Sequence, residues 1–156
     1  MPGFVDVVHD PAVRQFTFVP PDPDEEFVRG WIRRYEEGWE DGSRAGFAIV
    51  DGPGEVVGFA AVVQLDLDGR EGELGYLVAP AARGRGVAGR AVALLTDWCF
   101  ETLGLVRLEL RIDVDNGPSE RVAERLGYVR DGILRSKYFK EGRRSNVGIW
   151  SRLNDD

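Results

Sequence analysis

The sequence is poor in the side chains on which many catalytic centres depend. Its 156 residues include one cysteine, Cys99, and one histidine, His9. A single cysteine excludes an intramolecular disulfide framework and any multi-cysteine zinc or iron–sulfur site. The isolated histidine argues against a Ser-His-Asp triad or a histidine-rich metal site. We therefore expect no metal, and catalysis by carboxylates, hydroxyl groups, main-chain dipoles or a bound cofactor.

Long apolar runs and an excess of positive charge are also lacking. No stretch approaches the roughly 20 apolar residues of a membrane span. Residues 1–10 do not show the basic-then-apolar pattern of an export signal, which predicts a cytoplasmic protein. The chain has 27 acidic against 20 basic residues, a net charge of −7, and so disfavours nucleic acid and anionic membranes as partners.

The chain length and the pattern of elements predict a single domain over residues 1–156, of α/β or α+β class. Apolar periodicity and turn residues predict helices over 24–39, 86–103 and 118–126. They predict strands over 46–50, 55–65, 73–78, 105–114, 128–129, 133–139 and 146–153. Asp22 and Glu25 resemble a capping pair for the first helix. Its aromatic stripe either packs on a sheet or lines a substrate pocket: Phe27, Trp31, Tyr35 and Trp39.

The most specific local feature is a glycine-rich turn, residues 83–89, that follows the strand 73–78 and opens a long helix. Glycines permit close backbone approach to a ligand, and the first amides of a helix have no partner within it. The helix dipole adds partial positive charge there, which makes a pyrophosphate cradle that Arg83 and Arg85 can reinforce. Tight packing alone would be the structural explanation of the same glycines.

Gly84, Gly86 and Gly89 also match the dinucleotide-binding fingerprint, and Glu109 lies 20 residues further on. The context of the match is wrong, because Pro80 and further residues separate the turn from its strand. Only 67 residues follow Gly89, too few for a doubly wound sheet of the usual extent. A dinucleotide-binding oxidoreductase is thus a less favoured alternative.

Arg83-x-x-Gly86-x-Ala88, placed between a strand and a long helix, resembles the acyl-CoA-binding motif of the GNAT N-acetyltransferase family. Asn116 and Ser119, followed by a helix that ends in Leu-Gly-Tyr at residues 126–128, resemble the second cofactor element of its RimJ/RimL-like branch. The resemblance implies a central mixed, mostly antiparallel twisted sheet flanked by helices. It also implies acetyl-CoA as cosubstrate and a primary amine as acceptor, either a protein N-terminus or a small molecule.

The resemblance further implies residue roles. The main chain of three strand residues would pair with the pantetheine arm of the cofactor: Tyr76, Leu77 and Val78. The turn would hold the pyrophosphate through Arg83, Gly84, Arg85, Gly86, Val87, Ala88 and Gly89. Asn116 would bind the cofactor arm and Ser119 would donate a proton to the sulfur, although both residue types also suit helix capping. Glu73 would be the general base or, alternatively, an ordinary strand acid, with Glu71 and Tyr138 as weaker candidates.

Two departures from the family accompany this assignment. The family's first strand is expected to be missing or replaced, because nine residues precede the segment that begins at Asp10. An edge left uncovered in that way would make a homodimer plausible. Asn146 also stands where this branch often carries an acid. A non-catalytic acyl-CoA-binding or sensing module is the alternative to an enzyme.

Overall fold

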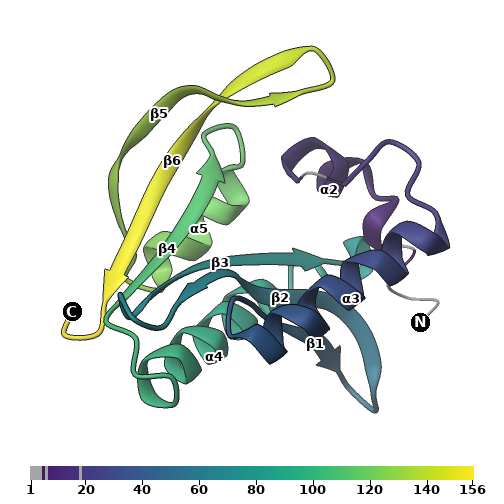
Figure 1. Ribbon diagram of the computed structural model, residues 1–156. Coiled ribbons are helices and arrows are strands. Elements are labelled where there is room, and N and C mark those ends of the chain that lie inside the picture. Colours follow the sequence, from purple (N-terminus) through teal and green to yellow (C-terminus); the bar gives the residue numbers. More distant parts are fainter. Residues whose placement is uncertain (1–4, 6, 18) are drawn as a thin grey trace.

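The computed structural model describes residues 5, 7–17 and 19–156, which build one mixed sheet with helices packed against it (Figure 1). The strand order is β1-β2-β3-β4-β6-β5. The strands are β1 (Ala45–Asp51), β2 (Glu55–Asp66), β3 (Glu71–Val78), β4 (Arg107–Asp113), β5 (Val129–Lys140) and β6 (Arg143–Leu153). Neighbouring strands are antiparallel except β3 and β4, which are parallel. This confirms the mixed, mostly antiparallel sheet and excludes the doubly wound alternative.

The last third of the chain corrects one sequence prediction. The segments 128–129 and 133–139 were predicted as separate strands, but Val129 and residues 133–139 belong to the continuous strand β5, which begins after Tyr128. Its pairing with β6 shifts register between Arg130 and Gly132 and again between Leu134 and Tyr138. The residues between the two predicted segments are thus absorbed as an irregularity within the ladder. At the second shift, the main-chain N–H of Ser136 donates to Asn146 Oδ1 at 2.8 Å.

Helix α3 (Glu25–Asp41) is capped by a different residue from the one predicted. Asp24, rather than Asp22, accepts a hydrogen bond from the Phe27 N–H at 2.8 Å. Asp22 and Asp24 are two positions apart, and only the backbone conformation decides which carboxylate faces the helix terminus. Gly42 ends the helix with a φ of 75°, in the left-handed region that glycine tolerates.

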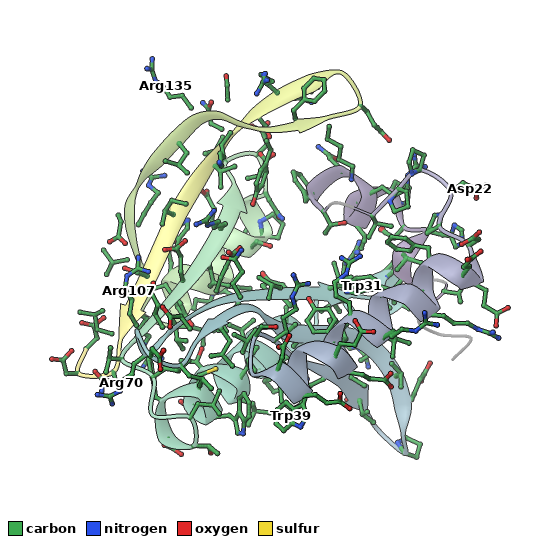
Figure 2. The ribbon with its side chains drawn as sticks, viewed as in Figure 1. Asp22, Trp31, Trp39, Arg70, Arg107 and Arg135 are labelled. Atoms are coloured by element: carbon green, nitrogen blue, oxygen red, sulfur yellow. The ribbon has the colours of Figure 1, made fainter. Side chains whose placement is uncertain are left out.

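The aromatic stripe of α3 serves two surfaces. Trp31 and Tyr35 contact Phe59 of β2 edge-on, with ring centroids 5.5 and 5.0 Å apart. Trp39 lies near the other end of the helix (Figure 2). It stacks instead on Trp98, in the helix that follows the glycine-rich turn. Trp31 and Tyr35 therefore pack on the sheet as predicted, and they also line a cleft described below.

Helix α4 (Val87–Glu101) and helix α5 (Gly117–Arg125) cover the face opposite α3. Successive side chains of β3 point to opposite faces of the sheet. Leu74 therefore joins the core under α4, and Leu77 joins the core under α3. Cys99 is fully buried in α4, as expected of a small apolar residue, and burial raises the pKa of its thiol to about 12. Tyr128 packs in the same core, with its hydroxyl 2.8 Å from Thr96 Oγ1.

Ahead of β1, the described residues contain helices and no strand. Helix α2 (Pro11–Phe16) begins after Asp10, whose carboxylate accepts from the Ala12 N–H. The predicted loss of the family's first strand also concerns residues 1–4 and 6, which lie outside the described residues. It stays a prediction. None of the helices in the described part combines the length and hydropathy that a membrane span requires.

Candidate active site

The parallel strands β3 and β4 separate part-way along their length. They pair only from Glu71 with Arg107 to Leu74 with Leu110, although β3 continues to Val78 and β4 to Asp113. In Figure 1 the two strands run apart from this common origin. A cleft of about 500 Å³ lies at the separation. Its lining includes Glu73, Tyr76, Leu77, Asn116, Ser119 and Tyr138, all named by the sequence analysis.

The end of β3 offers main-chain groups to this cleft. The Leu77 carbonyl lies against Gly58 of β2, so close that a Cβ atom at Gly58 would collide with it. Because main-chain groups alternate in direction along a strand, those of Tyr76 and Val78 point to the side from which β4 has departed. The Val78 carbonyl there accepts hydrogen bonds from the Arg83 guanidinium at 2.9 and 3.2 Å. The remaining main-chain groups of Tyr76 and Val78 on that side have no β4 partner.

The glycine-rich turn leads from β3 into α4 through the short 3-10 helix η1 (Pro80–Ala82). Gly84 and Gly86 have φ values of 75° and 73°, which explains why glycine occupies both positions. Gly86 is the N-cap and has no side chain that could accept a hydrogen bond. The main-chain N–H groups of Val87 and of the next two residues are therefore not capped by a side chain. This is the anion-binding geometry that the sequence predicts for the turn.

The arginines of the turn are held in place by neighbours. Arg83 forms an ion pair with the buried carboxylate of Asp10 at 3.1 Å, which ties the turn to the segment before α2. Arg85 lies 3.3 Å from Asp51 at the end of β1 and is more than half exposed. Arg90 donates to the Arg85 carbonyl at 2.8 Å. Arg83 therefore braces the loop, whereas the exposed Arg85 is the better placed to meet an anion.

Asn116 and Ser119 meet at the start of α5, on the wall of the cleft. Asn116 caps the helix, with its Oδ1 accepting from the Ser119 N–H at 3.4 Å. The Ser119 hydroxyl accepts a hydrogen bond from the Tyr76 hydroxyl at 2.9 Å. The capping interpretation of Asn116 is thus correct, and it leaves the Ser119 hydroxyl directed at the cleft. The side-chain role of Tyr76 was missed, because residues 43 positions apart give no local signal of contact.

Glu73 lies in the cleft where the two strands begin to separate. Its side chain is 20% exposed, and its Oε2 is 3.6 Å from Arg111 Nε of β4. Burial raises the pKa of Glu73 above the usual glutamate value, Arg111 opposes that shift, and Glu109 adds to it. A carboxylate of raised pKa with access to a cleft is a suitable proton acceptor.

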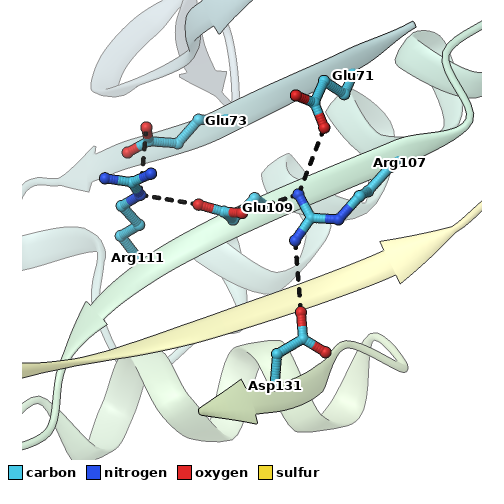
Figure 3. Close-up of polar contacts among 6 residues, drawn as sticks. All are labelled: Glu71, Glu73, Arg107, Glu109, Arg111 and Asp131. Atoms are coloured by element: carbon cyan, nitrogen blue, oxygen red, sulfur yellow. Dashed lines mark hydrogen bonds and ion pairs between the residues drawn. The ribbon is translucent and has the colours of Figure 1, made fainter. Parts of the chain in front are cut away.

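An ion-pair network surrounds Glu73 on the paired part of β3 and β4 (Figure 3). Glu109 accepts from Arg111 and from Arg107, each at 2.8 Å. Although partial burial raises the pKa of Glu109, these hydrogen bonds hold it below the usual value. Arg107 also lies 3.7 Å from Glu71 and 3.4 Å from Asp131. Glu109 is therefore an ion-pair partner in a strand, not the ribose-binding acid of a dinucleotide fold.

Arg107 and Arg111 were not among the residues predicted for the site. A signal was available, since Arg107, Glu109 and Arg111 alternate with leucines along one strand and so share a face. Arg107 and Arg111 lie opposite Glu71 and Glu73 because of the parallel register of β3 with β4. The sequence alone does not specify this register.

Aromatic residues complete the cleft opposite the main-chain groups. Trp31 and Tyr35 of α3 and Tyr138 of β5 line it together with Phe59. Burial raises the pKa of Tyr138, and the charge of Glu73 raises it further. The β5–β6 turn approaches α2 across the opening, where Glu141 pairs with Arg14 at 3.3 Å and the Lys140 ammonium contacts the Thr17 carbonyl.

Comparison with known proteins agrees with this architecture. Residues 1–129 match the family described as the acetyltransferase (GNAT) domain. An uncharacterised N-acetyltransferase, p20, of Bacillus licheniformis is 29% identical over 145 residues, which cover 92% of this chain and 82% of that protein. The spermidine N(1)-acetyltransferase of Escherichia coli is 30% identical over 113 residues, 72% of this chain and 60% of that enzyme. A Vibrio cholerae spermidine N-acetyltransferase, solved with CoA and spermine, superposes with a TM-score of 0.85 at 20% identity, covering 97% of this chain and 88% of that one.

The divergent strands, the glycine turn and the matched region together define the class of protein. The chain belongs to the GNAT family of acetyltransferases. It is an N-acetyltransferase that takes its acetyl group from acetyl-CoA. These findings favour an enzyme over a non-catalytic binding module and leave its acceptor to be argued from the cleft.

Proposed function

We propose that the protein acetylates a small cationic amine by direct attack on acetyl-CoA, with both substrates bound in the cleft between β3 and β4. The observation that carries this proposal is the arrangement around the strand separation. Main-chain donors and the glycine turn lie towards one end, and the half-buried carboxylate of Glu73 lies at the other. Binding both reactants in line supplies much of the rate enhancement through proximity.

The cofactor would extend β3 on the side that β4 leaves open. Main-chain groups of Tyr76 and Val78 would pair with the amides of the pantetheine arm in the manner of an added strand. The amides of residues 84–89 would hold the pyrophosphate, with Arg85 adding charge. Asn116 and Ser119 would then flank the thioester end, since both line the cleft beside Tyr76.

The reaction removes two protons from the acceptor nitrogen and adds one to the departing sulfur. Glu73 would take a proton from the acceptor ammonium, and the freed nitrogen lone pair would attack the thioester carbonyl. As the tetrahedral intermediate collapses, the carbon–sulfur bond breaks and its electron pair goes to sulfur. The Ser119 hydroxyl would donate a proton to that sulfur. The second proton of the attacking nitrogen would pass through water in the open cleft and restore the Ser119 hydroxyl, while Glu73 returns its proton to solvent. No covalent enzyme intermediate is required.

The lining of the cleft supports a small, positively charged acceptor. Trp31, Tyr35 and Phe59 contribute aromatic rings to the lining, a group whose face attracts cations, and Glu73 adds a carboxylate. The overall charge of −7 favours the approach of a cation. The similarity to a spermidine acetyltransferase points the same way.

An acceptor panel tests this assignment. With saturating acetyl-CoA, we expect kcat/KM for spermidine to exceed that for an uncharged-tail monoamine of matching length by at least about tenfold, because the second ammonium gains an interaction with the cleft. A peptide that carries a free N-terminal serine or alanine is the comparison for a protein acceptor. Faster acetylation of that peptide than of spermidine would contradict the proposal and favour a protein N-terminus.

We also propose that the protein works in the cytoplasm, where acetyl-CoA is supplied.

We further propose that the protein is a homodimer. The sheet order places β1 at an edge, and Phe47 and Val50 of this strand are 39% and 54% exposed. We expect light scattering at micromolar concentration to give twice the chain mass of 17.4 kDa. Val50→Lys should shift the mass towards that of one chain. A wild-type mass of 17.4 kDa would rule out the dimer.

A further inference from the structure

Tyr76 and Ser119 join the two sides of the cleft. Tyr76 lies in β3 and Ser119 in α5, which follows β4, so their contact spans the region where the strands separate. The phenol donates to the Ser119 oxygen at an O···O distance of 2.9 Å. Both side chains line the cleft. The pair is therefore placed beside the position argued above for the thioester.

The hydrogen bonds around Ser119 determine what its hydroxyl can still do. The Ser119 N–H is bonded to Asn116 Oδ1, and its hydroxyl oxygen already accepts from Tyr76. A serine hydroxyl has one hydrogen to donate, and this hydrogen remains available for a third group. Burial raises the pKa of Tyr76, although its hydrogen bond to Ser119 opposes the shift, so the phenol stays protonated and remains a donor near neutral pH.

We propose that Tyr76 is a positioning residue that acts through Ser119: its hydrogen bond orients the Ser119 hydroxyl so that this group donates to the sulfur of the departing CoA. The inference rests on the proposed role of Ser119. When the carbon–sulfur bond breaks and the electron pair moves to sulfur, the chain from Tyr76 through Ser119 to the thiolate is polarised along its length, and each hydrogen bond strengthens the next. Tyr76 keeps its own proton throughout.

The hydrogen bond between Tyr76 and Ser119 could also serve only to brace β3 against α5. The test therefore needs a measurement that reports on the sulfur of CoA. CoA bound to the enzyme in the absence of an acceptor provides this readout. Its thiolate absorbs in the ultraviolet, so the pKa of the bound thiol can be measured by titration. In the wild type we expect the thiol pKa of bound CoA to lie below that of free CoA. Tyr76→Phe should raise the bound value by about one unit, the equivalent of one charge-assisted hydrogen bond, and change the Kd of CoA less than about threefold.

Two variants serve as controls. In a Ser119→Ala background, Tyr76→Phe should cause no further shift of the thiol pKa, because the intermediary is gone. Tyr128→Phe is the matched structural control. It removes another buried tyrosine hydroxyl that contacts a side-chain hydroxyl, Thr96 Oγ1 at 2.8 Å, in the core under α4. It should lower the melting temperature and leave the titration unchanged.

The outcomes separate this inference from the proposed function. A wild-type thiol pKa equal to that of free CoA would remove Ser119 from its role and take the inference with it. A lowered wild-type pKa that Tyr76→Phe leaves unaltered would overturn only the inference. A shift of the same size in the Ser119→Ala background would also overturn it, since Tyr76 would then act by some other route.

Discussion

Replacing Glu73 with glutamine is expected to lower kcat by about 10²- to 10⁴-fold, the range for loss of a general base. Glutamine keeps the size of the side chain and cannot accept the ammonium proton. Burial raises the pKa of Glu73. In the wild type, kcat/KM should therefore increase with pH through a pKa above that of an ordinary glutamate, because only the ionised carboxylate accepts the proton. Steady-state assays with spermidine across the pH range measure both effects.

Glu71→Gln is the matched control. Glu71 lies two residues away on the same face of β3, also faces an arginine at 3.7 Å, and has a side chain that is 51% exposed. It should leave kcat within about threefold of the wild type. The acidic limb of the pH profile should disappear in Glu73→Gln and persist in Glu71→Gln. Equal losses in the two variants would assign the effect to the ion-pair network, and an unchanged kcat in Glu73→Gln would remove this residue as the base.

Gly89→Glu is expected to lower the affinity for CoA at least about 100-fold, the cost of losing two charge-assisted hydrogen bonds. Gly89 is the third residue of α4, and a Cβ atom there would meet open space within 4 Å. A carboxylate at this position would occupy the anion cradle and repel the pyrophosphate. The same change should stabilise the fold, because glutamate is a better helix former than glycine and is favourable in a first helical turn.

Because the fold is expected to become more stable while CoA binding becomes weaker, a loss of binding could not be attributed to unfolding. Calorimetric titration with CoA and a thermal melt of the same sample should show weaker binding together with a raised melting temperature. Leu94→Glu is the control, because Leu94 is 72% exposed further along the same helix and gains the same charge. It should bind CoA normally. Undiminished CoA affinity in Gly89→Glu would show that the cofactor does not use the helix N-terminus.

The separation of β3 from β4 would allow a small domain to accommodate a long cofactor. Over four residue pairs the strands hold each other in register, and an arginine–glutamate network spans that paired segment. Beyond it, the main chain of β3 has no partner on one side, and unpaired strand edges favour the addition of an extended ligand. The paired segment thus positions Glu73 rigidly beside the place where the cofactor would end.

Local patterns in the sequence determined most of the elements and the cofactor class. The hairpin at residues 51–54, the glycine turn and the helix that begins at Val87 depend on neighbouring residues and on φ values that glycine permits. Two separate motifs in the correct order were specific enough to indicate the family. These features are encoded within a few residues of one another, and periodicity and turn chemistry therefore suffice to predict them.

Only the tertiary structure decided which distant residues meet. The contacts of Tyr76 with Ser119, of Glu73 with Arg111 and of Arg83 with Asp10 join segments 38 or more positions apart. Each depends on strand register and on the packing of helices against a sheet, and a one-residue slip would turn every side chain of a strand to the other face. The chemistry of the cleft is set by these contacts, which is why the sequence could name its residues without showing how they act together.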